Sequence, residues 1–214
     1  MTGYHYDLFI SYKVNPQWND WTRKHLYKNL MAYLSDQVPW YPKIYLDEHT
    51  RTGADWVDTI GSALGRSKAL VAVLNVPYFS SQWCLHELDM MHSRLLHNGL
   101  KNIIFPIVVH SCADTVIPPE IKRLQTYDLK EFRNSMLIES TEMYVQFSAR
   151  VKELSSSILE AVQQPPPYEP CWELECKKRF NDLVLAKDSG VEVGVKTLTL
   201  SDPPQQNTIP RVTL

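Results

Sequence analysis

The sequence predicts an α/β protein in which a doubly wound parallel sheet is covered by helices on both faces. Short apolar runs alternate along the chain with longer amphipathic segments, which is the order of a strand–helix repeat. The run at 69–74 is apolar throughout and carries no charge, as expected of a strand buried on both faces. Parallel strands need crossover connections, and the amphipathic segments supply them.

Each element of this repeat has its own signal. Apolar, β-type runs predict five strands, at residues 6–12, 43–46, 69–74, 102–109 and 127–129. Helical spacing of apolar residues predicts four helices between or after them, at 18–34, 55–64, 83–96 and 141–162. Pro39 and Pro42 end the first helix, and Gly65 suits the end of the second. Pro106 is expected near a strand end or at a sheet edge.

The strand ends predict where a ligand would bind. Ser11, Asp47 and Asn75 lie at or just after the ends of the first three expected strands. Because carboxyl ends of parallel strands share one edge, and open α/β sheets bind ligands there, these residues mark the expected site.

Composition excludes several classes of protein. The 214 residues are 44% hydrophobic and 21% charged, with 22 basic and 24 acidic side chains, so no direct nucleic-acid contact is expected. No apolar run approaches the ~20 residues of a membrane span, and the N-terminus lacks a signal-peptide pattern. We expect a soluble, cytoplasmic protein without membrane contact. Four scattered cysteines without CxxC pairs indicate reduced thiols and no metal site.

Domain organisation follows from the prolines. We expect a main domain at 1–162, a Pro-rich linker at 163–171 and a C-terminal extension of unknown role at 172–214. The extension holds one possible helix, at 172–186, and one alternating stretch, at 191–200. It is expected either to pack on the main domain or to order on a partner.

Three segments stand out, at 9–13, 47–56 and 80–88, whereas motifs such as GxGxxG, GxxxxGKS/T, GxSxG and HExxH are absent. Trp83 and Glu87 are four residues apart and share one helix face, while Leu85 and Leu88 lie on the face that can meet the sheet. Glu87 is therefore expected outside the buried face. Spacing alone favours ordinary structural roles: a solvated acid at Glu87, a connecting loop at 47–56 and a buried strand at 9–13.

Together these segments resemble the Toll/interleukin-1 receptor (TIR) domain family. Residues 6–12 resemble its first box, and Asp47 with the run 53–56 resembles its loop after the second strand. Residues 81–88 resemble the S-x-W-C-x-x-E-L segment, the most specific of the three. The resemblance spans residues 4–162 and implies a flavodoxin-like TIR fold, with five parallel strands and helices on both faces. Thr52 departs from the proline that many members carry before the loop glycine.

The family implies two functions. Some TIR domains hydrolyse or cyclise NAD+ and release nicotinamide, whereas others only self-associate and recruit partners. In the enzymatic members the glutamate matching Glu87 is catalytic, and the tryptophan matching Trp83 lines the same pocket. The other residues expected to contact substrate are Ser11, Tyr12, Lys13, Asp47 and Arg51.

A single carboxylate is enough for the NAD+ cleavage that the resemblance implies. Cleavage of the nicotinamide–ribose bond builds oxocarbenium-like charge on the sugar, which a nearby carboxylate stabilises. Nicotinamide is a good leaving group from the cation, so no strong general acid, metal or cofactor is required, and NAD+ is a substrate.

The resemblance thus implies an NAD+ glycohydrolase or cyclase of the bacterial immune-effector type, acting in antiviral or cell-death signalling. Self-association through TIR–TIR contacts, or a separate sensor or effector protein, would activate it. A non-catalytic TIR adaptor is the alternative, and a flavodoxin-type receiver ranks last because no phosphate loop is present. The linear or cyclic nature of the product and the source organism stay open.

Overall fold

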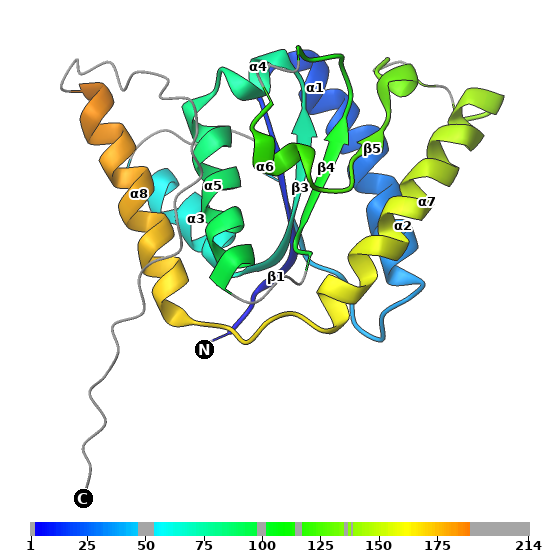
Figure 1. Cartoon of the computed structure of the whole chain (residues 1–214). Coiled ribbons are helices and arrows are strands. Elements are labelled where there is room, and N and C mark those ends of the chain that lie inside the picture. Colours follow the sequence, from blue (N-terminus) through cyan, green and yellow to red (C-terminus); the bar gives the residue numbers. More distant parts are fainter. Residues whose placement is uncertain are drawn as a thin grey trace, which may run out of the picture.

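The sheet has the five parallel strands that the sequence predicts. The computed structural model describes residues 3–46, 54–97, 102–113, 117–134, 137 and 139–188. Its strands are β1 (Tyr6–Tyr12), β2 (Ile44–Leu46), β3 (Ser67–Leu74), β4 (Ile104–Val108) and β5 (Tyr127–Asp128). They are ordered β2-β1-β3-β4-β5, and every neighbouring pair is parallel. Figure 1 labels β1, β3, β4 and β5 of this sheet.

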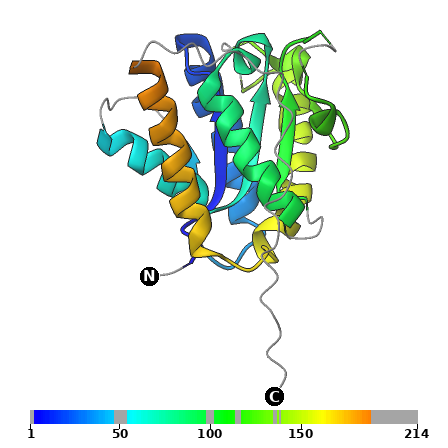
Figure 2. The same ribbon diagram turned by 60° about the vertical axis from the view of Figure 1, so that its left-hand side comes forward.

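Helices cover both faces of the sheet, so the predicted α/β fold is confirmed. The longer ones are α2 (Lys28–Ser35), α3 (Ala54–Gly65), α5 (Gln82–His97), α7 (Glu142–Gln163) and α8 (Pro170–Asp188). The shorter ones are α1 (Pro16–Trp21), a π-helical segment (Thr22–Tyr27), α4 (Val76–Phe79), α6 (Pro119–Lys122) and a 3-10 turn (Lys130–Phe132). In Figures 1 and 2, α1, α2 and α7 lie on one side of the sheet, and α3 and α5 lie on the other. Among the described helices, none is long and apolar enough to cross a bilayer.

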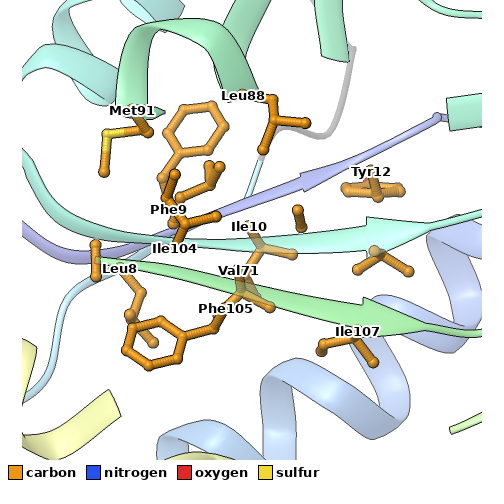
Figure 3. Close-up of a cluster of buried hydrophobic side chains, with 14 of the residues drawn as sticks. Leu8, Phe9, Ile10, Tyr12, Val71, Leu88, Met91, Ile104, Phe105 and Ile107 are labelled. Carbon is orange, nitrogen blue, oxygen red and sulfur yellow. The ribbon is translucent and has the colours of Figure 1, made fainter. Parts of the chain in front are cut away.

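The central strands are buried on both sides, which explains why their sequences are apolar without alternation. Leu8, Phe9 and Ile10 of β1 are fully buried. In the core, Leu88 and Met91 of α5 lie on one side of the strands (Figure 3). Because neighbouring residues of a strand point to opposite faces, β1 needs apolar side chains at consecutive positions.

Pro106 is not where the sequence placed it. It lies in the middle of β4, an inner strand rather than an edge strand. The Leu70 amide donates to the Ile103 carbonyl (2.8 Å), so alternate residues of this segment bond to β3 and Pro106 turns toward β5. β5 pairs only with Ile107 and Val108. The side of Pro106 that lacks an N–H therefore faces β5 at a point before the first β4–β5 pair, so no hydrogen bond between paired strands is lost.

The C-terminal extension forms a helix, α8, slightly longer than the expected 172–186. It packs along α3 and α5, on the side of these helices that faces away from the sheet (Figures 1 and 2). The expected stretch at 191–200 lies outside the described residues. The division into a main domain, a linker and an extension stays a prediction.

Candidate functional site

Glu87 is buried against the carboxyl end of β1. Its side chain is 5% exposed, and the Ser11 hydroxyl donates a hydrogen bond to its Oε2 atom. The expectation that Glu87 lies outside the buried face of α5 is wrong, and so is the solvated-acid interpretation. The reason is that Glu87 lies beside Leu88 on the side of α5 that meets β1, and the Ser11 hydroxyl at the end of that strand supplies a hydrogen-bond partner there.

A tyrosine that the sequence analysis did not single out extends this contact. The Tyr78 hydroxyl lies 2.9 Å from Ser11 Oγ and donates to the Cys84 carbonyl at 3.2 Å. Burial raises the pKa of the Tyr78 hydroxyl well above its ordinary value, and Cys84 and Glu87 add to that shift. The hydroxyl therefore keeps its proton and shares it between Ser11 and the Cys84 carbonyl.

Local sequence fixes the position of Tyr78. The Asn75 side chain caps α4 by accepting from the Tyr78 amide (2.8 Å), and Pro77 occupies an early helical position, where its missing N–H costs nothing. Asn75 followed closely by proline is a recognisable helix start, and this signal was present in the sequence.

The Ser11–Glu87 contact lies at the point where the strand order of the sheet reverses. β1 is flanked by β2 on one side and by β3 on the other, and Ser11 pairs with Ala72 of β3 near the carboxyl ends of both strands. Open α/β sheets bind ligands in the crevice outside the carboxyl ends of the strands at such a point. The position of Glu87 thus suits a ligand-binding residue.

Tyr12 and Lys13 follow Ser11 but are placed differently. Tyr12 is buried in the core, and because successive residues of a strand alternate, it faces away from Ser11 and Glu87. Lys13 is exposed. Burial and Glu87 raise the pKa of the Cys84 thiol, while the charge of Lys13 acts in the opposite direction. The structure therefore brings the Lys13 charge, but not the Tyr12 ring, toward this network.

Trp83 contacts other aromatic rings. Its ring centroid lies 4.6 Å from that of Trp56, at an interplanar angle of 58°. Phe180 of α8 stacks on it at 5.1 Å and 13°. Phe180 is fully buried and was missed from the sequence. One face of the half-buried Trp83 ring, which was expected to meet substrate, is therefore covered by the C-terminal helix.

Two predicted contact residues, Asp47 and Arg51, lie outside the described residues, and their roles stay predictions. Among the residues that the structure describes, no group of three or more His, Cys, Asp and Glu side chains is placed to hold a metal ion.

Comparison with known proteins gives consistent matches. A family model described as "TIR domain" matches residues 8–138. Toll-like receptor 4 of Pinctada imbricata is 27% identical over 120 residues, covering 54% of this chain and 12% of the receptor. Toll-like receptor 2 type-2 of Gallus gallus is 26% identical over 121 residues, covering 56% and 14%. The match thus spans only a small part of the length of these relatives.

Solved structures also match. The TIR domain of the Toll-related receptor TRR-2 of Hydra magnipapillata is 19% identical with a TM-score of 0.44, covering 58% of this chain and 85% of that one. TIR domains in the structure of the activated Roq1 resistosome are 16% identical with a TM-score of 0.33, covering 86% and 99%. The family match covers more than half of the chain, and its residues form the five-stranded parallel sheet described above. The chain therefore belongs to the TIR domain family.

Proposed function

We propose that this TIR domain cleaves the nicotinamide–ribose bond of NAD+, with Glu87 as the catalytic carboxylate. One observation carries the proposal: Glu87 is held by Ser11 at the carboxyl edge of the sheet, where its strand order reverses. Burying a carboxylate is costly unless it is hydrogen-bonded. Ser11 meets this need for Glu87, and a carboxylate that is buried and held at the ligand-binding edge of the sheet is a candidate for function.

The proposed reaction follows from the charge of the substrate. The glycosidic bond breaks and its electron pair leaves with neutral nicotinamide, while positive charge develops on the ribose. Glu87 stabilises that charge, and its interaction strengthens as the bond breaks. Water then attacks the ribose carbon and releases a proton, which gives ADP-ribose; attack by an adenine nitrogen gives the cyclic product instead.

Ser11 and Tyr78 act in this proposal through Glu87. Ser11 donates to the carboxylate, and the Tyr78 hydroxyl oxygen lies 2.9 Å from Ser11 Oγ. A chain of hydroxyls polarises along its length, so these two side chains fix the orientation of Glu87. Lys13 is exposed and lies two residues after Ser11, and it is proposed to meet a phosphate of the substrate.

The biological setting is also proposed. Relatives named as Toll-like receptors favour a role in innate immune signal transduction. We propose that activity depends on self-association through TIR–TIR contacts or on a separate sensor, in the cytoplasm. Antiviral or cell-death signalling, as the resemblance implied for bacterial immune effectors, is the proposed outcome.

Nicotinamide release tests the proposal. Wild type and Glu87→Gln are compared over a series of protein concentrations. Glutamine keeps an acceptor for Ser11 but removes the charge. Release that rises with concentration and is lost in Glu87→Gln supports the proposal. Glu153→Gln, which changes an exposed acid on α7, is the matched control and should behave as wild type. Equal release from Glu87→Gln would remove the assigned role.

A non-catalytic adaptor is the second candidate, favoured by the receptor names of the relatives. An adaptor would self-associate in sedimentation experiments and show no nicotinamide release at any concentration. The two candidates thus differ in turnover and not in assembly.

A further inference from the structure

We infer that α8 is an intramolecular cover for the Trp83 ring, so that docking of α8 and binding of NAD+ at this ring exclude each other. The inference rests on the proposed function, because it takes the Trp83 ring as part of the substrate site. It adds a means of regulation within the chain: the site opens when α8 moves.

The stacking geometry makes the exclusion direct. Phe180 lies nearly parallel to Trp83, with 5.1 Å between ring centroids and 13° between planes. This is an offset-stacked arrangement, the same one that a nicotinamide or adenine ring would adopt on tryptophan. Phe180 is fully buried, so a flat ligand gains this face of Trp83 only if Phe180 leaves.

The surface beneath α8 is shaped for a helix. Gly61 and Gly65 lie one helical turn apart on α3, so they share one face. A Cβ atom at Gly65 would lie 2.5 Å from the Glu173 Cα atom, and one at Gly61 would lie 2.8 Å from the Lys177 Cα atom. The two glycines therefore allow the α8 backbone to approach α3 closely.

Polar contacts fix the register of α8. Arg179 forms an ion pair with Asp89 of α5, and Glu173 accepts a hydrogen bond from Ser62 of α3. At the start of α8, the buried Arg94 guanidinium lies 4.3 Å from the centre of the Trp172 ring. These contacts lie between Trp172 and Arg179, in the first half of α8 next to Phe180, so the stack on Trp83 belongs to a specific docked state.

Undocking of α8 need not rearrange the sheet, although Cys176 and Phe180 join the hydrophobic core. α8 contacts α3 and α5 and lies outside them, and residues 164–169 join it to α7. Its departure would leave the order of the five strands intact. Undocking exposes these apolar side chains, so it carries a cost that binding of NAD+ or of a partner has to offset.

Two variants of the full chain release α8 by different routes. Phe180→Ala removes the ring that covers Trp83, and Gly65→Ala pushes the α8 backbone away without changing either ring. Leu174→Ala alters a 68% exposed residue of α8 and is the matched control. Each is assayed for nicotinamide release, and for NAD+ binding by calorimetry in a Glu87→Gln background that blocks turnover. Wild type with NAD+ is examined by hydrogen exchange of residues 170–188.

The inference predicts that both variants bind NAD+ at least about tenfold more tightly than the control, that both release nicotinamide faster, and that NAD+ speeds amide exchange in α8 of the wild type. If cleavage depends on Glu87 but neither variant gains binding, the cover is refuted and the proposed function stands. If no protein cleaves NAD+ but both variants bind it more tightly, the cover stands and the proposed function fails. The cover is also refuted if NAD+ leaves amide exchange in α8 of the wild type unchanged and the variants that fold bind NAD+ no more tightly than the control. This outcome does not require both variants to fold.

Discussion

Gly65→Ala tests whether α8 is held as closely to α3 as the structure shows. Gly65 does not have a left-handed backbone, and an added Cβ would lie 2.5 Å from the Glu173 Cα atom and 3.1 Å from the Trp172 carbonyl oxygen. Both are backbone atoms, so no flexible side chain can move aside. The substitution therefore forces α8 as a whole to shift or undock.

Two terms set the magnitude. Overpacking of a close contact costs about 1–3 kcal/mol, whereas alanine favours a helix over glycine by about 1 kcal/mol. The net expectation is a loss of about 0–2 kcal/mol in the free energy of unfolding. Gly3, with no atom within 4 Å of an added Cβ, gives a matched control, and Gly3→Ala should change stability by less than about 0.5 kcal/mol.

Urea denaturation measures the loss, and hydrogen exchange locates it. Amides of residues 170–188 should exchange faster in Gly65→Ala than in Gly3→Ala, while amides of β1 and β3 should keep their protection. A Gly65→Ala protein that is as stable as wild type, with α8 equally protected, would refute the close approach of the two helices.

Three further changes have defined outcomes. Tyr78→Phe removes a buried hydroxyl that is bonded to Ser11 and a carbonyl; urea denaturation should show a loss of about 1–2 kcal/mol, and kcat for nicotinamide release should fall more than KM changes. Asp7→Asn leaves the Lys68 ammonium, now 2.6 Å from the carboxylate, without its partner charge, and should cost about 3 kcal/mol by the same measurement. Burial lowers the pKa of His92 below its ordinary value. The neutral imidazole therefore stabilises the folded protein above about pH 6.5, and this stabilisation is lost as the pH falls through the pKa of His92 in the folded protein. The melting temperature of His92→Phe should depend less on pH between 7.5 and 5 than that of the wild type.

Each of these outcomes has a counterpart that would contradict it. If Tyr78→Phe changed neither the free energy of unfolding nor kcat, the Tyr78 hydroxyl would not support Glu87. An unchanged Asp7→Asn protein would mean that the pair with Lys68 is solvated. A His92→Phe protein with the same pH dependence as wild type would place the titrating group elsewhere.

The sheet was predictable because its signals are local. Residues 69–74 are apolar at consecutive positions, and this follows directly from burial on both faces of β3. Strand and helix also alternate in a way that allows few topologies. Pro106 misled the sequence analysis because the direction of its missing N–H depends on register, which no local pattern contains.

The burial of Glu87 was not predictable from the spacing of α5. That argument took only the side of Leu85 and Leu88 to face the sheet, whereas Glu87 also reaches the end of β1, where Ser11 donates to it. Trp172, Cys176, Phe180 and Leu183 are all buried on α8, and their spacing is visible in the sequence as one apolar stripe. The stripe shows that α8 packs on something, but the identity of α3 and α5 as its partners follows only from the fold.

The assignment of Glu87 as the catalytic carboxylate is tested most directly by one measurement. Wild-type protein at high concentration is incubated with NAD+ beside Glu87→Gln, and the products are separated and quantified. The account predicts nicotinamide together with ADP-ribose or its cyclic form from wild type, and none from Glu87→Gln when the variant unfolds as the wild type does. Equal nicotinamide from both proteins, or none from a wild type shown to self-associate, would contradict it.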